Sequence, residues 1–208
     1  MILRGICQDV WWSDSWDPKE YGQDYDFSRS FFDQWRELFH KVPLPSLYTA
    51  HTTMVNSDYC NAASSLKDCY LCFRITGGEN SAYANLIVDL KSSFDISFSN
   101  HCELCYESLR LNKCYQTFFS QGCDDCHNVW FSKDLVGCSD CIGCINLKNK
   151  KYCIFNEEYS KEEYEAKKKE FDFSSRSGLE AFKEKVAEFM LTQPRKNFYG
   201  RRNEDVSG

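Results

Sequence analysis

Residues 102–126 read CELCYESLRLNKCYQTFFSQGCDDC, and all five cysteines of this segment lie at positions divisible by three. The same register holds on both sides, because twelve of the thirteen cysteines lie on it between Cys60 and Cys153. Small or apolar residues fill its other positions from 57 to 153, with Lys150 as the one exception. A period of three therefore separates an inward row of side chains from the charged residues, which lie off the register.

A period of three is too short for an α-helix and too long for a flat strand. A 3₁₀-helix does not persist over so long a stretch, and collagen requires glycine at every third position. A coil that turns four corners, with one inward residue per side, fits the pattern and predicts a longer period of twelve. Aromatic residues show that longer period: Tyr70, Phe94, Tyr106, Phe118 and Trp130.

The sequence therefore predicts a parallel β-solenoid over residues 57–156, with an all-β core of twelve-residue rungs stacked about 4.8 Å apart. We expect it to be right-handed by the usual crossover rule. Its interior is narrow, so inward Cys, Ser, Ala and Leu fit there, and the aromatic stripe must be buried from outside or remain a binding surface.

The repeat resembles the twelve-residue β-helix of beetle antifreeze proteins, whose inward Cys, Ser and Ala also recur every three residues. The resemblance covers only the repeat and implies an architecture. The Thr-x-Thr ice-binding array of that family is absent, so antifreeze function is not implied. The disulfides of that family are not carried over to this chain.

Upstream of the repeat, residues 1–56 form an aromatic-rich segment that we expect to cover the solenoid. Its tryptophans are interpreted as cover for apolar surface rather than as a ligand platform. Residues 28–40 have apolar residues at helical spacing behind Ser28 or Ser30 as N-cap, which predicts one helix. Pro43 and Pro45 end it.

Downstream, residues 157–191 are predicted to form a helical cap, so the chain is α+β as a whole. Ser160 and Glu163 have the spacing of a capping box at the start of one helix, and a second helix follows over residues 178–191. Solenoids require such caps at their open ends. Residues 192–208 are polar and are interpreted as a mobile tail.

Three segments, beginning DVWWSD, NSDYCNAA and NLKNKKYC, resemble an uncharacterised bacterial family of cysteine-rich proteins. Longer members of that family carry zinc-ribbon cysteine pairs ahead of the WWSD segment. This chain has only Cys7 there, so the resemblance implies no zinc ribbon and names no activity.

The composition limits the function further. A formal charge of −6 and a pI near 5.3 argue against a nucleic-acid binder. The sequence shows no signal-peptide pattern and no bilayer-spanning apolar run, so we expect a soluble cytoplasmic protein without membrane contact. In a reducing cytosol the cysteines are packed thiols or metal ligands rather than disulfides. The sequence does not indicate the oligomeric state.

The cysteines offer the one candidate metal site. C-x-x-C spacings suit tetrahedral zinc, but here the period of three already explains them. Packed filler thiols are the favoured interpretation, with structural zinc second and redox catalysis last. If zinc is bound, its predicted ligands are on neighbouring rungs around one corner: Cys126, Cys138, Cys141 and Cys153.

No catalytic or cofactor-binding residues are predicted. The favoured function is a non-enzymatic binding or scaffold protein whose partner is a protein or a glycan. The alternative is a carbohydrate-active enzyme that uses carboxylates on the outer face as an acid/base pair. The candidate carboxylates are Asp124, Asp125, Asp134 and Asp140.

Overall fold

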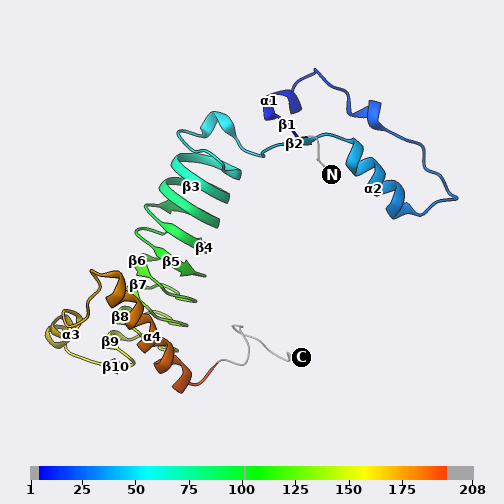
Figure 1. The fold of residues 1–208 in the computed structure, drawn as a ribbon. Helices are drawn as coiled ribbons and strands as arrows, with labels where there is room; N and C mark the ends of the chain where they lie inside the picture. The colour runs from blue at the N-terminus through cyan, green and yellow to red at the C-terminus, as the bar shows by residue number, and fades with distance from the viewer. Residues whose placement is uncertain (1–4, 101, 196–208) are drawn as a thin grey trace. The chain divides into compact units, whose positions relative to one another are not determined.

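The computed structural model describes residues 5–100 and 102–195. The chain separates into two units, Met1–Lys91 and Ser92–Gly208, and each contains solenoid turns, drawn in Figure 1 as stacked strands. In the first unit the turns run into β3 (Asn61–Lys91). Val55 pairs with Lys67 and Asp58 with Tyr70 in parallel bridges, each twelve residues apart.

In the second unit, short parallel strands follow at the same period. Partners in neighbouring strands are twelve residues apart, as in Phe94↔Tyr106 and Cys141↔Cys153. The twelve-residue parallel β-solenoid with helices at its ends is therefore confirmed, while its handedness stays a prediction. The strands are β4 (Phe94–Asn100), β5 (Tyr106–Leu109), β6 (Tyr115–Phe118), β7 (His127–Trp130), β8 (Ser139–Ile142) and β9 (Lys151–Ile154).

The backbone conformation explains the period of three. Among the described residues from Asn56 to Phe155, every third one has a positive φ, from 44° at Ser92 to 76° at Gly77. Each of these left-handed residues directly precedes a position of the inward register and turns one corner of the rung. The left-handed conformation costs a non-glycine residue roughly 1–2 kcal/mol, so the ladder and the interior must offset it at each corner.

Inside the turns, polar side chains are satisfied by the backbone. A thiol or hydroxyl donates to the carbonyl two residues earlier, as Cys126 does to Asp124 (3.4 Å) and Ser120 to Phe118 (2.8 Å). The Ser120 hydroxyl also accepts from the backbone N–H of Ser132, one turn later (3.2 Å). All thirteen cysteines are free, and twelve are buried. Small hydrogen-bonding side chains thus suit this narrow interior.

The solenoid ends in a reversal of the chain. Strand β10 (Glu157–Glu158) runs antiparallel to β9. The Asn156 amide accepts from the Ile145 N–H (2.9 Å) and donates to the Ile145 carbonyl (3.1 Å), so it takes the place of a further turn on that side. Lys150, the exception on the inward register, is exposed here and pairs with Glu158 at 2.7 Å.

Two helices follow in the second unit. α3 (Lys161–Lys168) begins with the predicted capping box of Ser160 and Glu163, and α4 (Arg176–Thr192) is capped by Ser175. Both pack against outer side chains of the last turns. The buried cluster that results consists of Phe131, Ile142, Ile154, Tyr164, Phe182 and Val186. The predicted tail, 192–208, lies mostly outside the described residues.

The N-terminal segment of the first unit is mostly short elements. The predicted helix is present as α2 (Phe31–Lys41), with Ser30 as N-cap. That residues 1–56 cover the solenoid stays a prediction. None of the described helices is long and apolar enough to cross a bilayer. The other elements are β1 (Gly5–Ile6), α1 (Gln8–Trp11), η1 (Pro18–Tyr21), β2 (Leu44–Pro45) and η2 (His51–Thr53).

Candidate interaction surfaces and interior thiols

One side of the rung carries most of the outward aromatic residues. We call positions 58 and 59, with those that follow at steps of twelve, the aromatic column. In the second unit α4 and the segment before it bury part of this column. Phe131 is only 3% exposed, with its ring 4.6 Å from Phe119, 5.6 Å from Phe173 and 4.9 Å from Phe182. The C-terminal helices therefore cover an outer face as well as following the last turn.

A cation of α4 contacts this face. Lys183 Nζ lies 3.2 Å from Glu107 Oε2 and 4.4 Å from the centre of the Phe119 ring. Burial by itself lowers the pKa of Lys183, but the hydrogen bond and charge of Glu107 raise it above its usual value, so the side chain stays cationic. A groove of about 450 Å³ lies between α4 and the solenoid. Glu107, Lys183, Phe119, Phe131 and Met190 line it.

In the first unit the same column is exposed. Tyr59, Tyr70 and Tyr83 are 66%, 44% and 53% exposed. Their ring centres are 5.6 and 6.0 Å apart, with interplanar angles of 79° and 87°, so they form an edge-to-face ladder. In the second unit, Phe94 and Tyr106 of the column are also exposed, at 45% and 38%. Rows of exposed rings of this kind mark interaction surfaces.

The helix α2 has a second exposed aromatic face. Phe32, Trp35 and Phe39 are 71%, 53% and 38% exposed, and Trp35 stacks on Phe39 with ring centres 5.2 Å apart. The covered side of this helix is polar instead. Gln34 is only 5% exposed and accepts a hydrogen bond from the Asp26 N–H at 2.8 Å.

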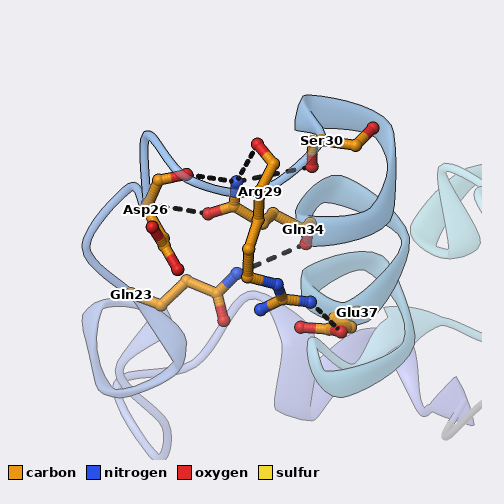
Figure 2. A network of polar contacts seen from close by, with 6 residues as sticks. All are labelled: Gln23, Asp26, Arg29, Ser30, Gln34 and Glu37. Carbon is orange, nitrogen blue, oxygen red and sulfur yellow. Dashed lines mark hydrogen bonds and ion pairs between the residues drawn. The ribbon is translucent and has the colours of Figure 1, made fainter.

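Figure 2 shows how the preceding loop closes around Gln34. The Gln34 amide donates to the carbonyls of Asp26 (2.9 Å), Arg29 (3.3 Å) and Ser30 (3.4 Å). Arg29 also forms an ion pair with Glu37, one turn further along α2. The loop thus holds the polar side of α2 and leaves its aromatic side free, which the sequence pattern alone did not indicate.

The four candidate metal ligands lie on two inward rows of neighbouring rungs. Cys141 and Cys153 are register partners in neighbouring strands, and Cys126 and Cys138 follow at a step of twelve on another inward row. Each of the four thiols donates to the carbonyl two residues earlier, at 3.3 to 3.6 Å. In the described part of the chain, no group of three or more His, Cys, Asp or Glu has the arrangement of a metal site. Zinc binding stays a prediction.

The protonation of these thiols suits packing. Burial raises the pKa of Cys138, and burial together with the charge of Cys141 raises the pKa of Cys153 to about 12. The hydrogen bond with Cys144, followed by burial, raises the pKa of Cys141. Metal ligation requires thiolates, so binding of a metal here would have to release the protons of these buried thiols.

The four candidate carboxylates lie on three different sides of the rung. Asp124 and Asp125 precede the inward Cys126, whereas Asp134 and Asp140 precede inward residues of two other rows. Different neighbours contact them: Asn112 Nδ2 donates to Asp124 (2.9 Å), Lys113 pairs with Asp125 (3.7 Å), and Asn128 Nδ2 donates to Asp140 (2.8 Å). The structure therefore does not assemble them into an acid/base pair on one face.

These features define a β-solenoid repeat protein with free interior thiols and an outer aromatic column. No family model matches the chain, and a comparison with curated proteins gives no match. Among solved structures it is similar to UDP-N-acetylglucosamine O-acyltransferase (LpxA) from Moraxella catarrhalis RH4. The two are 10% identical, the match covers 70% of this chain and 91% of that one, and the TM-score is 0.29. This similarity indicates no activity for the chain, and the resemblance to cysteine-rich bacterial proteins stays a prediction.

Proposed function

We propose that this chain is a non-enzymatic binding or scaffold protein that recognises a polypeptide through the exposed part of its aromatic column. One observation carries the proposal. The column is buried where an amphipathic helix lies on it, with Phe131 3% exposed, and open where none does, with Tyr83 53% exposed. Open apolar surface is costly in water, and its burial by a partner favours association.

A polypeptide suits this surface better than a glycan. The rings of Tyr59, Tyr70 and Tyr83 pack edge to face along the column, with interplanar angles of 79° and 87°. Neighbouring rings therefore do not form one flat platform for a row of sugar rings. Apolar side chains of a helix do fit between such rings, as Phe182 of α4 does beside Phe131 in the second unit.

We propose further that the interior thiols are packing groups rather than metal ligands. The donation of Cys138 and Cys141 to backbone carbonyls and the raised pKa values of Cys138 and Cys153 support this. Protein purified under reducing conditions should carry no stoichiometric metal after dialysis, and a chelator should not change its melting temperature. About one tightly held zinc per chain, lost together with stability in chelator, would place Cys126, Cys138, Cys141 and Cys153 in a metal site.

The binding function is tested by photo-crosslinking in the native host. A photoreactive phenylalanine analogue replaces Tyr70, and in a control it replaces Tyr48, which is 64% exposed but lies outside the column. We expect a discrete adduct with one polypeptide from position 70 and not from position 48. Tyr83→Ser in the same chain should reduce the adduct several-fold. No polypeptide adduct above the control, or an adduct that a glycosidase removes, would contradict the proposal.

A further inference from the structure

Two helices of this chain share one pattern of side chains. Residues 32–39 of α2 read FDQWRELF, and residues 179–186 of α4 read LEAFKEKV. Both have apolar residues at the first, fourth and eighth positions, acidic residues at the second and sixth, and a basic residue at the fifth. Apolar positions at this spacing lie on one helical face, so each helix places a cation beside its central aromatic residue.

In α4 this pattern is used to cover the aromatic column. Phe182 and Val186, at the fourth and eighth positions, are 4% and 6% exposed. The basic fifth residue, Lys183, reaches Glu107 at 3.2 Å and lies over the Phe119 ring. The fourth residue lies 4.9 Å from Phe131, two rungs after Glu107.

In α2 the corresponding groups have no such partner. Trp35 and Phe39, at the fourth and eighth positions, are 53% and 38% exposed. Within residues 5–100 and 102–195, no ion pair involves Arg36, the basic fifth residue. Because the loop of Figure 2 covers the opposite, polar side of the helix, the face with the shared pattern is the open one.

The aromatic column of the first unit offers the matching groups in the same order. In the second unit Glu107 is followed one and two rungs later by Phe119 and Phe131. In the first unit Asp58 is followed one rung later by Tyr70 in the same row. Tyr83 lies one rung further on in the neighbouring row, which is the row of Glu107, Phe119 and Phe131. Asp58 is exposed and has no ion pair among the residues that the structure describes. The eleven residues of α2 are about 16 Å long at 1.5 Å per residue, enough to span three rungs about 4.8 Å apart.

We propose that α2 of one copy docks Phe32, Trp35 and Phe39 on the aromatic column of the first unit of a second copy, with Arg36 paired to Asp58. This inference rests on the proposed function and names the partner polypeptide. Each copy has both a helix face and a column, so two copies can exchange helices in a closed two-fold pair.

The connection of α2 to its own solenoid favours the second copy. Only Val42 and Pro43 separate α2 from β2, whose Leu44 pairs with Gly5 of β1. The Ser46 N–H then donates to the Ile6 carbonyl at 2.8 Å. Two residues span about 7 Å at most, and a proline fixes part of that span. A connection this short restricts folding of α2 onto the column of its own copy, whereas the column of a second copy is free of that restriction.

Sedimentation of the full chain under reducing conditions, over a wide range of concentrations, tests this. We expect a monomer–dimer equilibrium whose dissociation constant rises at least tenfold for Trp35→Ser. Trp12 is 68% exposed and lies outside both the aromatic face of α2 and the aromatic column, so Trp12→Ser should leave the dissociation constant unchanged. A monomer at all concentrations, or an equal effect of the two substitutions, would overturn the inference.

A charge exchange tests the pairing itself without loss of an aromatic residue. Arg36→Glu and Asp58→Arg should each weaken the dimer several-fold, and the two together should restore it. Arg36→Glu with Asp68→Arg, an acid on another side of the rung, should not restore it. Absence of specific rescue would overturn the pairing.

The crosslinking experiment separates this inference from the proposed function. If the chain stays monomeric while position 70 crosslinks to a different polypeptide, the second-copy inference fails and the binding function stands. If position 70 crosslinks to no polypeptide, both fail.

Discussion

The aromatic column arises from the same twelve-residue repeat in the two units, but it is exposed in the first unit and partly buried in the second. Tyr83 and Phe131 are forty-eight residues apart, four rungs of twelve, and have φ of 56° and 51°. Yet Tyr83 is 53% exposed and Phe131 only 3%. The rungs do not cause this difference, because α4 and the segment before it supply the cover in the second unit. The repeat thus fixes which side is apolar, and the segments outside the repeat decide whether that side is core or binding surface.

The interior should behave alike in both units. Cys72 and Cys126 are 0% and 1% exposed, so Cys72→Asp and Cys126→Asp each bury a charge without a partner. We expect each to lower the free energy of unfolding by more than about 4 kcal/mol or to prevent folding. Asp125→Cys, next to Cys126 but exposed, should be tolerated. Thermal unfolding of the three variants checks this, and equal shifts for Cys126→Asp and Asp125→Cys would refute the inward register.

The outer face should behave differently in the two units. Phe131→Ala removes a buried ring and should cost about 3–5 kcal/mol of unfolding free energy. Tyr83→Ala should cost about 1 kcal/mol or less, because most of that ring is already in water. Both residues have a left-handed backbone conformation, so the backbone contribution to the change in unfolding free energy cancels in the comparison. Urea unfolding measures both values, and similar losses at the two sites would show that the first-unit column is covered as well.

Alkaline pH tests the burial of the interior thiols in both units without a substitution. Burial raises the pKa of Cys60 and raises that of Cys153 to about 12. Thiols of the unfolded chain titrate near about 8.5, so above that pH the unfolded state loses protons first. The free energy of unfolding should therefore fall as pH rises from about 8.5 toward 12 and be unaffected by these groups at lower pH. Melting temperatures should fall less steeply for Cys60→Ala and Cys153→Ala than for the wild type, whereas a steady or rising melting temperature above pH 8.5 would be evidence against buried thiols.

The ion pair on α4 should make the smallest contribution. Lys183→Ala removes contacts with Glu107 and Phe119 that are partly open to water, and we expect a loss of about 0.5–1 kcal/mol. Lys185→Ala, two residues away and exposed, is the matched control and should change the stability by less. If Lys183→Ala has no more effect than Lys185→Ala, then apolar contacts alone hold α4 on the column.

Much of the architecture could be predicted from the sequence. The cysteine register fixed the twelve-residue rung, and Ser160 with Glu163 indicated the start of α3. The left-handed corners could not be predicted, because Tyr83 and Phe131 have no intrinsic preference for a positive φ.

The surfaces were harder to predict, because contacts far apart in sequence determine them. An apolar helical face shows that a partner exists but does not identify it, and Lys183 and Glu107 are seventy-six residues apart. The four candidate aspartates are close in sequence, but the corners of the rung place them on different sides of the solenoid. The cover that we expected from residues 1–56 remains untested, whereas the C-terminal helices cover the later turns.

Hydroxyl-radical footprinting with mass spectrometry, on the dilute monomeric chain, compares the two parts of the column most directly. We expect rapid oxidation of Tyr59, Tyr70 and Tyr83, partial protection of Phe119 and strong protection of Phe131. Both sets should react rapidly once the chain is unfolded. Comparable protection of the two sets in the folded monomer would contradict the claim that the first-unit column is an open binding surface.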